Sequence, residues 1–437
     1  MGVSVTTRAL GDALAAIVGP AGAIDAPAAR RAAAVDGREP QIVVRPRTLD
    51  EAARIVALAH DERLAVVPRG GGTALTLGIP IARVDLVLDL AGLDAIVEHN
   101  PEDMTATVQA GVTAGALAAR LAAHRQTLPL DPPGWSGRTL GGIAATAASG
   151  PLRARYGTMR DLLLGVRFVQ ADGVLTWGGA RVVKSVTGYD VPKLLVGSLG
   201  TLAVLGELTL RLHPLPESEA TCLVPVHSVD AAQELAAFVV DSTLQPNRLE
   251  LLDQAALAAS GLPPAAAGVV VSFGSVTPAV RAQQAAITAE AARMRTRAET
   301  MGPGFWRTYD RMLAAMGPTL LRVSTLATRV AATLGEARAA LGGAGGVVMT
   351  GGLSLGLLRI AVGQGEPALL ATAVERLRAF VAADGGSVVI ERGAPALRTR
   401  VDPWGAVPPP TFALMRALKQ EFDPERTLNP GRFVGGI

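Results

Sequence analysis

Residues 68–73 read Pro-Arg-Gly-Gly-Gly-Thr, and this glycine run constrains the fold more than any other stretch of the chain. It follows the apolar run Ala65-Val66-Val67, which predicts a strand. Successive glycines can take backbone angles that other residues avoid, and they let a ligand touch the main chain. Their N–H groups can converge on a diphosphate without any side-chain charge. The pattern fits both a nucleotide-cofactor loop and an ordinary glycine-rich turn.

The composition limits the classes of function. With 437 residues, 49% of them hydrophobic, the chain is long enough for about two or three domains with their own cores. A net charge of +3 and an aromatic content of 3% give nucleic-acid binding little support. Cys222 is the only cysteine, which excludes a disulfide and an iron–sulfur ligand set within the chain.

Targeting segments are not evident in the sequence. The N-terminus lacks the pattern of a signal peptide, and every apolar run is broken well before it reaches a membrane-spanning length. We therefore expect a cytoplasmic protein. Peripheral contact with the inner membrane through a partner stays open.

Histidines are confined to the first part of the chain. The last of the five is His227, and almost half of the chain follows it. A histidine-ligated metal or a histidine base is therefore excluded from the C-terminal half. We predict no metal site.

The sequence changes character near Pro214-Leu215-Pro216. Before this point, strand patterns alternate with glycine-rich stretches, and Thr48 with Glu51 predicts the start of a helix that runs to about residue 61. After it, strand–helix–strand patterns occur twice, which suits an α+β sandwich of ferredoxin-like type. The expected fold class is α+β.

Two further stretches are rich in small residues. Residues 140–150 read Leu-Gly-Gly-Ile-Ala-Ala-Thr-Ala-Ala-Ser-Gly, which suits a backbone pressed against a flat ligand or against another helix. Residues 363–368, Gly-Gln-Gly-Glu-Pro-Ala, fit a nicotinamide-binding fingerprint, with Glu391 at the end of the next strand. Glu366 would put a carboxylate where a pyrophosphate should dock, so an ordinary helix start competes with this interpretation.

Several motifs occur in a fixed order along the chain. They are residues 68–73, residues 140–150, Arg155-Tyr156-Gly157, Gly188-Tyr189-Asp190 with Lys193, residues 197–204, and Leu428-Asn429-Pro430-Gly431. Together they resemble the FAD-linked oxidases of the vanillyl-alcohol oxidase and para-cresol methylhydroxylase type. The stretch from Gly179 through Lys184 to Thr201 is similar to the branch that holds the FAD-binding E subunit of bacterial glycolate oxidase.

The resemblance implies a set of FAD-binding residues. Residues 68–73 and Gly141-Gly142 would hold the pyrophosphate, Gly200 and Val204 would lie near the adenine, and Asn429 would approach the flavin ring. The full implied set is Pro68, Arg69, Gly70, Gly71, Gly72, Thr73, Thr139, Leu140, Gly141, Gly142, Ala145, Thr146, Gly150, Tyr156, Gly157, Gly200, Val204 and Asn429. Since the first loop contains no histidine or cysteine, we expect the FAD to be bound noncovalently.

One departure from the family concerns the C-terminal half. Stand-alone D-2-hydroxyacid dehydrogenases of this fold carry a histidine set there that binds metal and serves the substrate. Where those enzymes show Glu-His-Gly, this chain has Glu391-Arg392-Gly393. Arg392 can bind a carboxylate, but a guanidinium is a poor proton acceptor. Arg392 is thus a substrate-binding candidate, a surface arginine is the competing interpretation, and the catalytic base is unknown, with Tyr156 and Tyr189 as weak candidates.

These features predict a domain order and a function. We expect an N-terminal helical segment (1–35), a two-subdomain FAD-binding domain (36–214), a ferredoxin-like α+β substrate domain (215–406) and a tail that returns to the flavin (407–437). The expected function is that of an FAD subunit in a glycolate (2-hydroxyacid) oxidase complex, with a paralogous FAD subunit and an iron–sulfur subunit as partners. A self-sufficient D-2-hydroxyacid dehydrogenase and a non-catalytic subunit that stabilises a paralogue are the alternatives. Lacking a base, the isolated chain should be nearly inactive.

Overall fold

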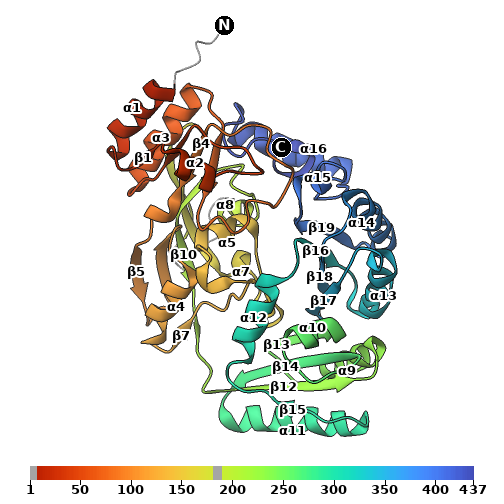
Figure 1. Ribbon diagram of the computed structural model, residues 1–437. Helices are drawn as coiled ribbons and strands as arrows, with labels where there is room; N and C mark the ends of the chain where they lie inside the picture. Colours follow the sequence, from red (N-terminus) through yellow and green to blue (C-terminus); the bar gives the residue numbers. More distant parts are fainter. Residues whose placement is uncertain (1–6, 181–188) are drawn as a thin grey trace.

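The computed structural model describes residues 7–180 and 189–437. In Figure 1, residues coloured red to yellow form one part of the molecule, and residues coloured green to blue form a second part below and to its right. The motif residues Lys184 and Gly188 lie outside the described residues. The α+β class expected from the sequence is confirmed, since both parts contain helices together with sheets that are wholly or partly antiparallel.

The first part contains two main sheets. One sheet has the order β1-β2-β4-β3, with β2, β4 and β3 parallel, and the other is antiparallel with the order β5-β6-β10-β8-β9. Their strands are β1 (Ala23–Ile24), β2 (Ile42–Val44), β3 (Val66–Arg69), β4 (Leu86–Asp89), β5 (Ile96–Asn100), β6 (Thr105–Gln109), β8 (Leu163–Val169), β9 (Leu175–Gly179) and β10 (Val204–Arg211). The two short strands β7 (Gln126–Thr127) and β11 (His213–Pro214) pair separately.

Helices pack against these two sheets. They are α1 (Thr7–Val18), α2 (Pro27–Ala32), α3 (Leu49–Asp61), α4 (Ala114–Ala122), α5 (Leu140–Thr146), α6 (Arg153–Tyr156), α7 (Met159–Leu162) and α8 (Val191–Leu195). The start of α3 agrees with its sequence signal, because the Thr48 hydroxyl accepts a hydrogen bond from the Glu51 amide at 3.1 Å. Thr139 caps α5 in the same way, through the Gly142 amide.

The second part is built on one eight-stranded antiparallel sheet with the order β15-β12-β14-β13-β17-β18-β16-β19. Its first half runs β12 (Ser218–Val226), α9 (Val229–Asp241), β13 (Arg248–Asp253), β14 (Ala267–Ser275), α11 (Thr277–Arg293) and β15 (Glu299–Thr300). Its second half runs β16 (Thr319–Ser324), α13 (Val330–Leu341), β17 (Val347–Gly352), β18 (Leu357–Val362), α14 (Pro367–Ala382) and β19 (Ser387–Arg392). Each half is a ferredoxin-like β-α-β-β-α-β unit, as expected, and the units join where β13 pairs with β17.

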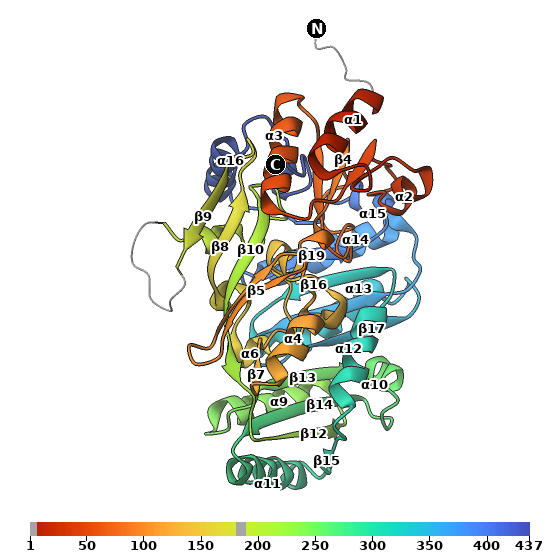
Figure 2. The same cartoon turned by 90° about the vertical axis from the view of Figure 1, so that its left-hand side faces the viewer.

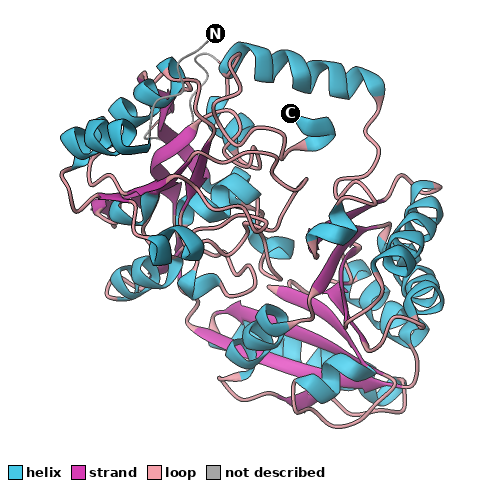
Figure 3. Cartoon of the chain, turned by 45° about the horizontal axis from the view of Figure 1, so that its top comes forward, coloured by secondary structure: helices cyan, strands magenta, loops and turns pink. Residues whose placement is uncertain are grey.

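The two faces of this sheet differ in character. Side chains alternate between the faces along each strand. Leu251, Leu321 and Ile360 belong to the large core that these strands share with α9, α11, α13 and α14, and Figure 3 shows helices beside the sheet of the second part. The intervening positions Glu250, Arg322 and Arg359 therefore belong to the opposite face, which α10 (Gln254–Ala259) and α12 (Phe305–Ala315) cover only in part. Arg359 Nη2 donates to the carbonyl oxygen of Ser149, so this polar face meets the first part.

The C-terminal segment returns to the first part. After α15 (Pro395–Arg398), helix α16 (Pro409–Phe422) lies near the N-terminal part of the chain in both views (Figures 1 and 2). Leu428 then pairs in parallel with Val66 of β3. Lys419 Nζ is buried and donates to Asp423 Oδ2 at 2.6 Å and to the carbonyl oxygen of Thr201 at 2.7 Å. These contacts hold the tail beside the glycine loop.

Candidate functional site

The glycine loop after β3 is shaped by close approach to another segment. A Cβ added to Gly70 would lie 2.1 Å from Thr139 Oγ1, so only glycine fits there. Gly72 has a φ of 72°, a left-handed conformation that favours glycine. Gly71 has no positive φ, and a Cβ there would meet the nearest atom only at 3.4 Å. Of the three glycines, Gly71 is thus the one with space for a Cβ atom.

Helix α5 packs as tightly as the loop. A Cβ on Gly141 would lie 2.7 Å from the Cβ of Ala110, and one on Gly150 would lie 1.8 Å from the carbonyl oxygen of Asp131. Tight packing therefore accounts for these two glycines. Gly142 instead faces the loop, where it lines a groove together with Gly70 and Thr139.

Most of the residues implied by the family resemblance lie along this groove, which runs between the two sheets of the first part. They are Pro68, Arg69, Gly70, Gly71, Gly72, Thr73, Thr139, Gly141, Gly142, Ala145, Thr146, Gly200 and Asn429. The groove also takes in residues outside the implied set, namely Ala74, Leu75, Leu90, Ala110, Leu199, Ala203, Leu205 and Arg432.

The other implied FAD residues lie elsewhere. Leu140 and Val204 are buried in hydrophobic cores. Gly150 lines a neighbouring cavity, and Tyr156 lines a third one, where its ring meets His213 edge-to-face at 5.1 Å. Gly157 has a φ of 80° and would clash with Asp161 if it carried a Cβ, which accounts for the glycine by backbone geometry.

The groove suits a dinucleotide by its polar atoms. Arg69 and Arg432 line it, and the Nε atoms of both are buried without a protein partner among the described residues. Asn429 donates through Nδ2 to the carbonyl oxygen of Leu199 at 2.6 Å, while its Oδ1 is buried without a partner in the same described part. Burial lowers the pKa of Arg432 to about 10, opposed by the Asp36 carboxylate. Two cations beside a glycine backbone fit a diphosphate.

A second cavity lies between the two parts of the molecule and begins where the small-residue stretch ends. Ser149, Gly150 and Arg153 line it from the first part, and Glu250, Arg322, Gly352, Leu358 and Arg359 line it from the sheet of the second part. Arg322 and Arg359 are direct cross-strand partners on β16 and β18. Like charges placed opposite one another repel, so this pair requires a negative counter-charge.

Glu391 supplies part of that counter-charge. Its carboxylate lies 3.3 Å from Arg322 Nε and 3.9 Å from Arg359 Nε. Burial is the main cause that lowers the pKa of Arg138 and of Arg153, and the nearby arginines add to it in both cases. The charge of Arg359 thus acts on both Arg138 and Arg153, while Asp161 offsets part of the charge on Arg153 and Glu391 part of that on Arg138. Three arginines and one glutamate line the cavity, a charge pattern that fits an anion.

Glu250 lines this cavity itself, unlike Glu391, and it differs from Glu391 in its surroundings. Its side chain is only 4% exposed, and Oε2 accepts a hydrogen bond from the Tyr309 hydroxyl at 2.7 Å. Burial raises the pKa of Glu250 to about 7, against the lowering effect of Tyr309 and Arg359. Sequence reasoning did not single out this residue. The sequence did contain a signal for it, because Glu250 is the one charged residue in the otherwise apolar run 249–252.

Arg392 has other contacts than those expected. Its Nη1 donates to the carbonyl oxygen of Met316 at 2.8 Å and to that of Gly317 at 3.2 Å, just past the end of α12. It lines none of the described cavities. The arginines that line the cavity are Arg153 of the first part and Arg322 and Arg359 of the second, and the sequence singled out none of them as a substrate-binding residue.

The remaining candidates also have defined places. Tyr189 is 96% exposed, and burial raises the pKa of Tyr156, so neither phenol is suited to accept a proton. In residues 7–180 and 189–437 no group of His, Cys, Asp or Glu is arranged to hold a metal ion. Glu366 caps α14 by accepting from the amides of Ala368 and Leu369, which identifies residues 363–368 as a helix start.

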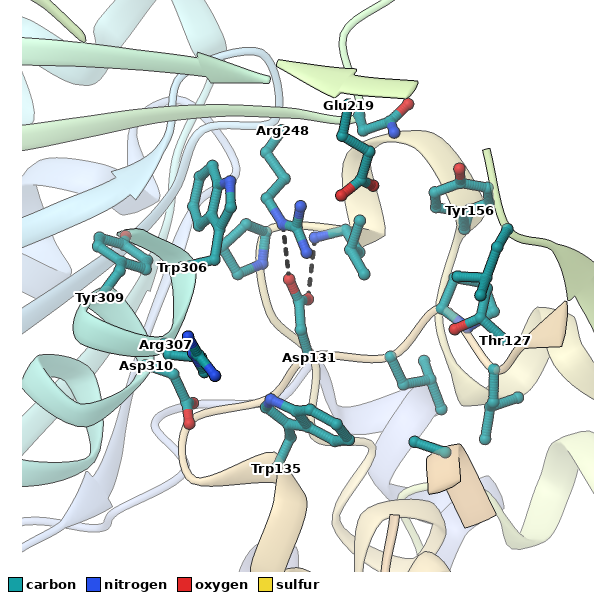
Figure 4. Close-up of a pocket in the computed structure, with 18 of the residues that line it drawn as sticks. Thr127, Asp131, Trp135, Tyr156, Glu219, Arg248, Trp306, Arg307, Tyr309 and Asp310 are labelled. Carbon is teal, nitrogen blue, oxygen red and sulfur yellow. Dashed lines mark hydrogen bonds and ion pairs between the residues drawn. The ribbon is translucent and has the colours of Figure 1, made fainter. Parts of the chain in front are cut away.

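A third cavity, of about 270 Å³, lies at the same interface and shares Pro151 with the second one. Figure 4 shows Asp131 of the first part paired with Arg248 of β13, 3.0 Å apart, and Trp306 close by. The Arg248 guanidinium lies 4.4 Å from the Trp306 ring centroid. Asp310 Oδ1 accepts from the Gly134 amide at 2.7 Å. These contacts link the two parts of the chain.

Comparisons with known proteins agree with this arrangement. Residues 40–179 match the FAD binding domain family, and residues 215–433 match the family of FAD linked oxidases, C-terminal domain. Among the described residues no helix is long and apolar enough to cross a membrane. The fold is that of 4-ethylphenol oxidase from Gulosibacter chungangensis, with a TM-score of 0.75 at 15% identity over 99% of this chain and 98% of that one.

Two curated relatives differ in coverage. Glycolate oxidase subunit GlcD of Bacillus subtilis is 34% identical over 238 residues, which are 53% of this chain and 51% of the relative. D-2-hydroxyglutarate dehydrogenase of Xanthomonas citri is 28% identical over 90% of this chain and 89% of that protein. The chain thus spans about half the length of the GlcD relative. The two domain matches, the groove and the shared fold lead to one conclusion: the chain belongs to the FAD-linked oxidase family, and its cofactor is FAD.

Proposed function

We propose that the chain oxidises a small 2-hydroxyacid with FAD, as the flavin subunit of a complex of the glycolate oxidase kind. The arginine cavity is the observation that carries the substrate class. Arg153, Arg322 and Arg359 line one cavity, and the Glu391 carboxylate pairs with two of them, Arg322 and Arg359. A substrate carboxylate would supply the missing negative charge.

The residues of the chain bind and orient in this proposal. The groove residues Gly70, Thr139 and Arg432 would hold the diphosphate of FAD, and the cofactor supplies the redox chemistry as the hydride acceptor. Arg322 and Arg359, fixed on neighbouring strands, would hold the substrate carboxylate between them. A carboxylate pinned in this way leaves its α-carbon in one orientation, which lowers the entropic cost of the reaction.

Electrons would leave the chain for a partner. One cysteine, Cys222, is present, and it is buried. The chain therefore has no ligand set for an iron–sulfur centre. A separate iron–sulfur subunit and a paralogous FAD subunit are the partners that we propose, and they would also make any contact with the inner membrane.

Anaerobic reduction tests the substrate class. The purified complex, and the FAD-loaded chain alone, are mixed with glycolate, D-lactate or D-2-hydroxyglutarate while the visible flavin absorbance is followed. Bleaching by at least one acid supports the proposal.

The variant Arg322→Met tests the arginine pair. It should raise the half-saturating concentration of the hydroxyacid about ten- to a hundredfold, since a hydrogen bond to a charged group is worth about 1.5–3 kcal/mol. The exposed Arg376, which pairs with Glu336, provides the control Arg376→Met.

A self-sufficient dehydrogenase is the second candidate. It is favoured by the similarity to D-2-hydroxyglutarate dehydrogenase, which extends over 90% of the chain. Comparable steady-state turnover of the isolated chain and of the complex with a dye acceptor would decide for it. Bleaching of the flavin by no acid in either form would leave the non-catalytic subunit as the better description.

A further inference from the structure

We propose that Glu250 accepts the hydroxyl proton of the substrate in the cavity that carries Arg153, Arg322 and Arg359. This inference rests on the proposed function, which provides a 2-hydroxyacid in that cavity. It gives the chain a base of its own in place of the histidine that the family resemblance implied. It also makes the flavin of this chain the site of the reaction.

The position of Glu250 follows from the strand that carries it. Leu249 and Leu251 point into the large core, so Glu250 points to the opposite face of the sheet. There it lines the same cavity as Arg322 and Arg359. Its partner on the neighbouring strand β17 is Gly352. A Cβ at position 352 would lie 3.3 Å from Glu250 Oε1, so the glycine keeps room beside this oxygen.

The two oxygens of the carboxylate have different roles. Oε2 accepts from the Tyr309 hydroxyl at 2.7 Å. Tyr309 is buried on α12 between two aromatic neighbours. Its ring stacks with that of Phe305, with 6.1 Å between the ring centroids, and it meets the Trp306 ring edge-to-face, with 5.4 Å between the centroids. Oε1 accepts no hydrogen bond from any residue in the described part of the chain. One oxygen is thus anchored and the other is left for a substrate.

The charges around Glu250 suit a proton acceptor. Arg359 from β18, Arg248 from β13 and the Tyr309 hydroxyl favour its ionised form, while burial and Asp131 oppose ionisation. The result is a pKa of about 7. A base is most effective when its pKa lies near the working pH, because it is then both free to accept a proton and basic enough to hold it.

The step balances with the groups named. The hydroxyl O–H bond breaks and its proton passes to a Glu250 oxygen. The O–H electron pair forms the C=O bond as hydride leaves the α-carbon for FAD. The hydroxyacid is oxidised by two electrons to the 2-oxoacid and FAD is reduced by two. Glu250 then releases its proton before the next turnover.

Glu250→Gln tests the assignment by kinetics. The amide keeps the shape and can still accept from Tyr309, but it cannot take up a proton. Anaerobic flavin reduction by the best hydroxyacid should slow by about 10²–10⁴-fold, with FAD content unchanged. The control Glu290→Gln alters a buried glutamate of α11 that pairs with Arg293. The flavin of this control should be reduced at the parent rate. Parent-like reduction of the Glu250→Gln protein would overturn the proposal.

Tyr309→Phe separates a chemical role from a structural one. The Tyr309 hydroxyl lowers the pKa of Glu250, so its removal should raise that pKa. The reduction rate falls as pH drops through the pKa of the base, so the acidic limb of the pH profile should move to higher pH in the variant. An unmoved limb would contradict a base at Glu250.

Oxalate binding provides a readout without turnover. Oxalate is a dicarboxylate that cannot be oxidised by hydride loss, and calorimetry in buffers of different ionisation enthalpy counts the protons taken up when it binds. An anion beside Glu250 raises its pKa, so the parent at pH 7 should take up about half a proton. Glu250→Gln should take up none. If both proteins take up the same number of protons on binding oxalate, the proposal for Glu250 is overturned, even if no hydroxyacid reduces the flavin. If only the parent takes up protons and no hydroxyacid reduces its flavin, Glu250 keeps its assignment and only the proposed substrate class is removed.

Discussion

Individual residues carry the main chemical features of this chain. Gly70 is fixed by Thr139, Glu250 by Tyr309, and the pair Arg322–Arg359 by the sheet register. The glycine loop could be predicted because its composition is unusual. Glu250 and Arg322 could not, because each is one polar residue in a strand and its function arises only when distant strands meet.

Gly70→Ala should abolish FAD binding. The added methyl would lie 2.1 Å from Thr139 Oγ1, so the loop or the start of α5 must move out of the geometry that lines the groove. The FAD content after purification, read from the visible spectrum, checks this. Gly335→Ala on α13 is the control, since nothing lies within 4 Å of its added Cβ. A yellow Gly70→Ala protein with parent affinity would show that the loop does not hold the cofactor.

Glu250 should also give the fold a pH dependence. Its pKa rises from 4.5 to about 7 on folding, so the folded state binds the proton more tightly than the unfolded state. The stability that this provides is present below the unfolded pKa and is lost as pH rises through about 7. The loss amounts to about 3 kcal/mol. When the unfolding free energy is measured by denaturant at several pH values in this range, it should change less steeply with pH for Glu250→Gln than for the parent. Identical slopes would contradict a carboxyl held in its neutral form.

At the scale of elements, the duplicated ferredoxin-like unit creates the cavity. β13 and β17 are the same strand of each unit, and their pairing places Glu250 of one unit beside Arg359 of the other. The pair Thr48 and Glu51 predicted the start of α3, and the repeated strand–helix–strand pattern predicted the ferredoxin-like character of the second part. The elements α12, β16, α13 and β17 were missed, because charged or small residues interrupt their patterns and packing alone orders them.

The tail is predicted to depend on the buried pair of Lys419 and Asp423. Asp423→Asn would leave Lys419 buried without its counter-charge, and burial already lowers the pKa of Lys419. Unfolding free energy should fall by about 3–5 kcal/mol, with weakened FAD retention. Lys193→Met breaks the exposed pair with Asp190 and should cost at most about 1 kcal/mol. Similar losses in the two variants, measured by chemical denaturation, would argue against the tail as an anchor.

At the scale of the whole molecule, the site exists only where the two parts of the chain meet. Arg153 comes from the first part and Glu250, Arg322 and Arg359 from the second, so neither part alone contains the cavity. The family resemblance predicted both parts and the cofactor. It implied inactivity of the isolated chain for want of histidine, whereas the buried Glu250 supplies a carboxylate at that interface.

The FAD should be noncovalent. The residues that line the groove include no histidine and no cysteine among those described, so the usual linking side chains are missing there. Acid precipitation should release all of the yellow colour into the supernatant. Flavin that stays on the precipitated protein would show a covalent link and a different groove chemistry.

The most direct test of the account is a single anaerobic mixing experiment. The FAD-loaded chain, without partners, is mixed with glycolate, D-lactate or D-2-hydroxyglutarate, and the visible absorbance of the oxidised flavin is recorded over time in the parent and in Glu250→Gln. At least one acid should bleach the parent flavin rapidly and the variant flavin slowly. A parent flavin that stays oxidised with every acid, both alone and in its complex, would contradict the central claim that this chain oxidises 2-hydroxyacids.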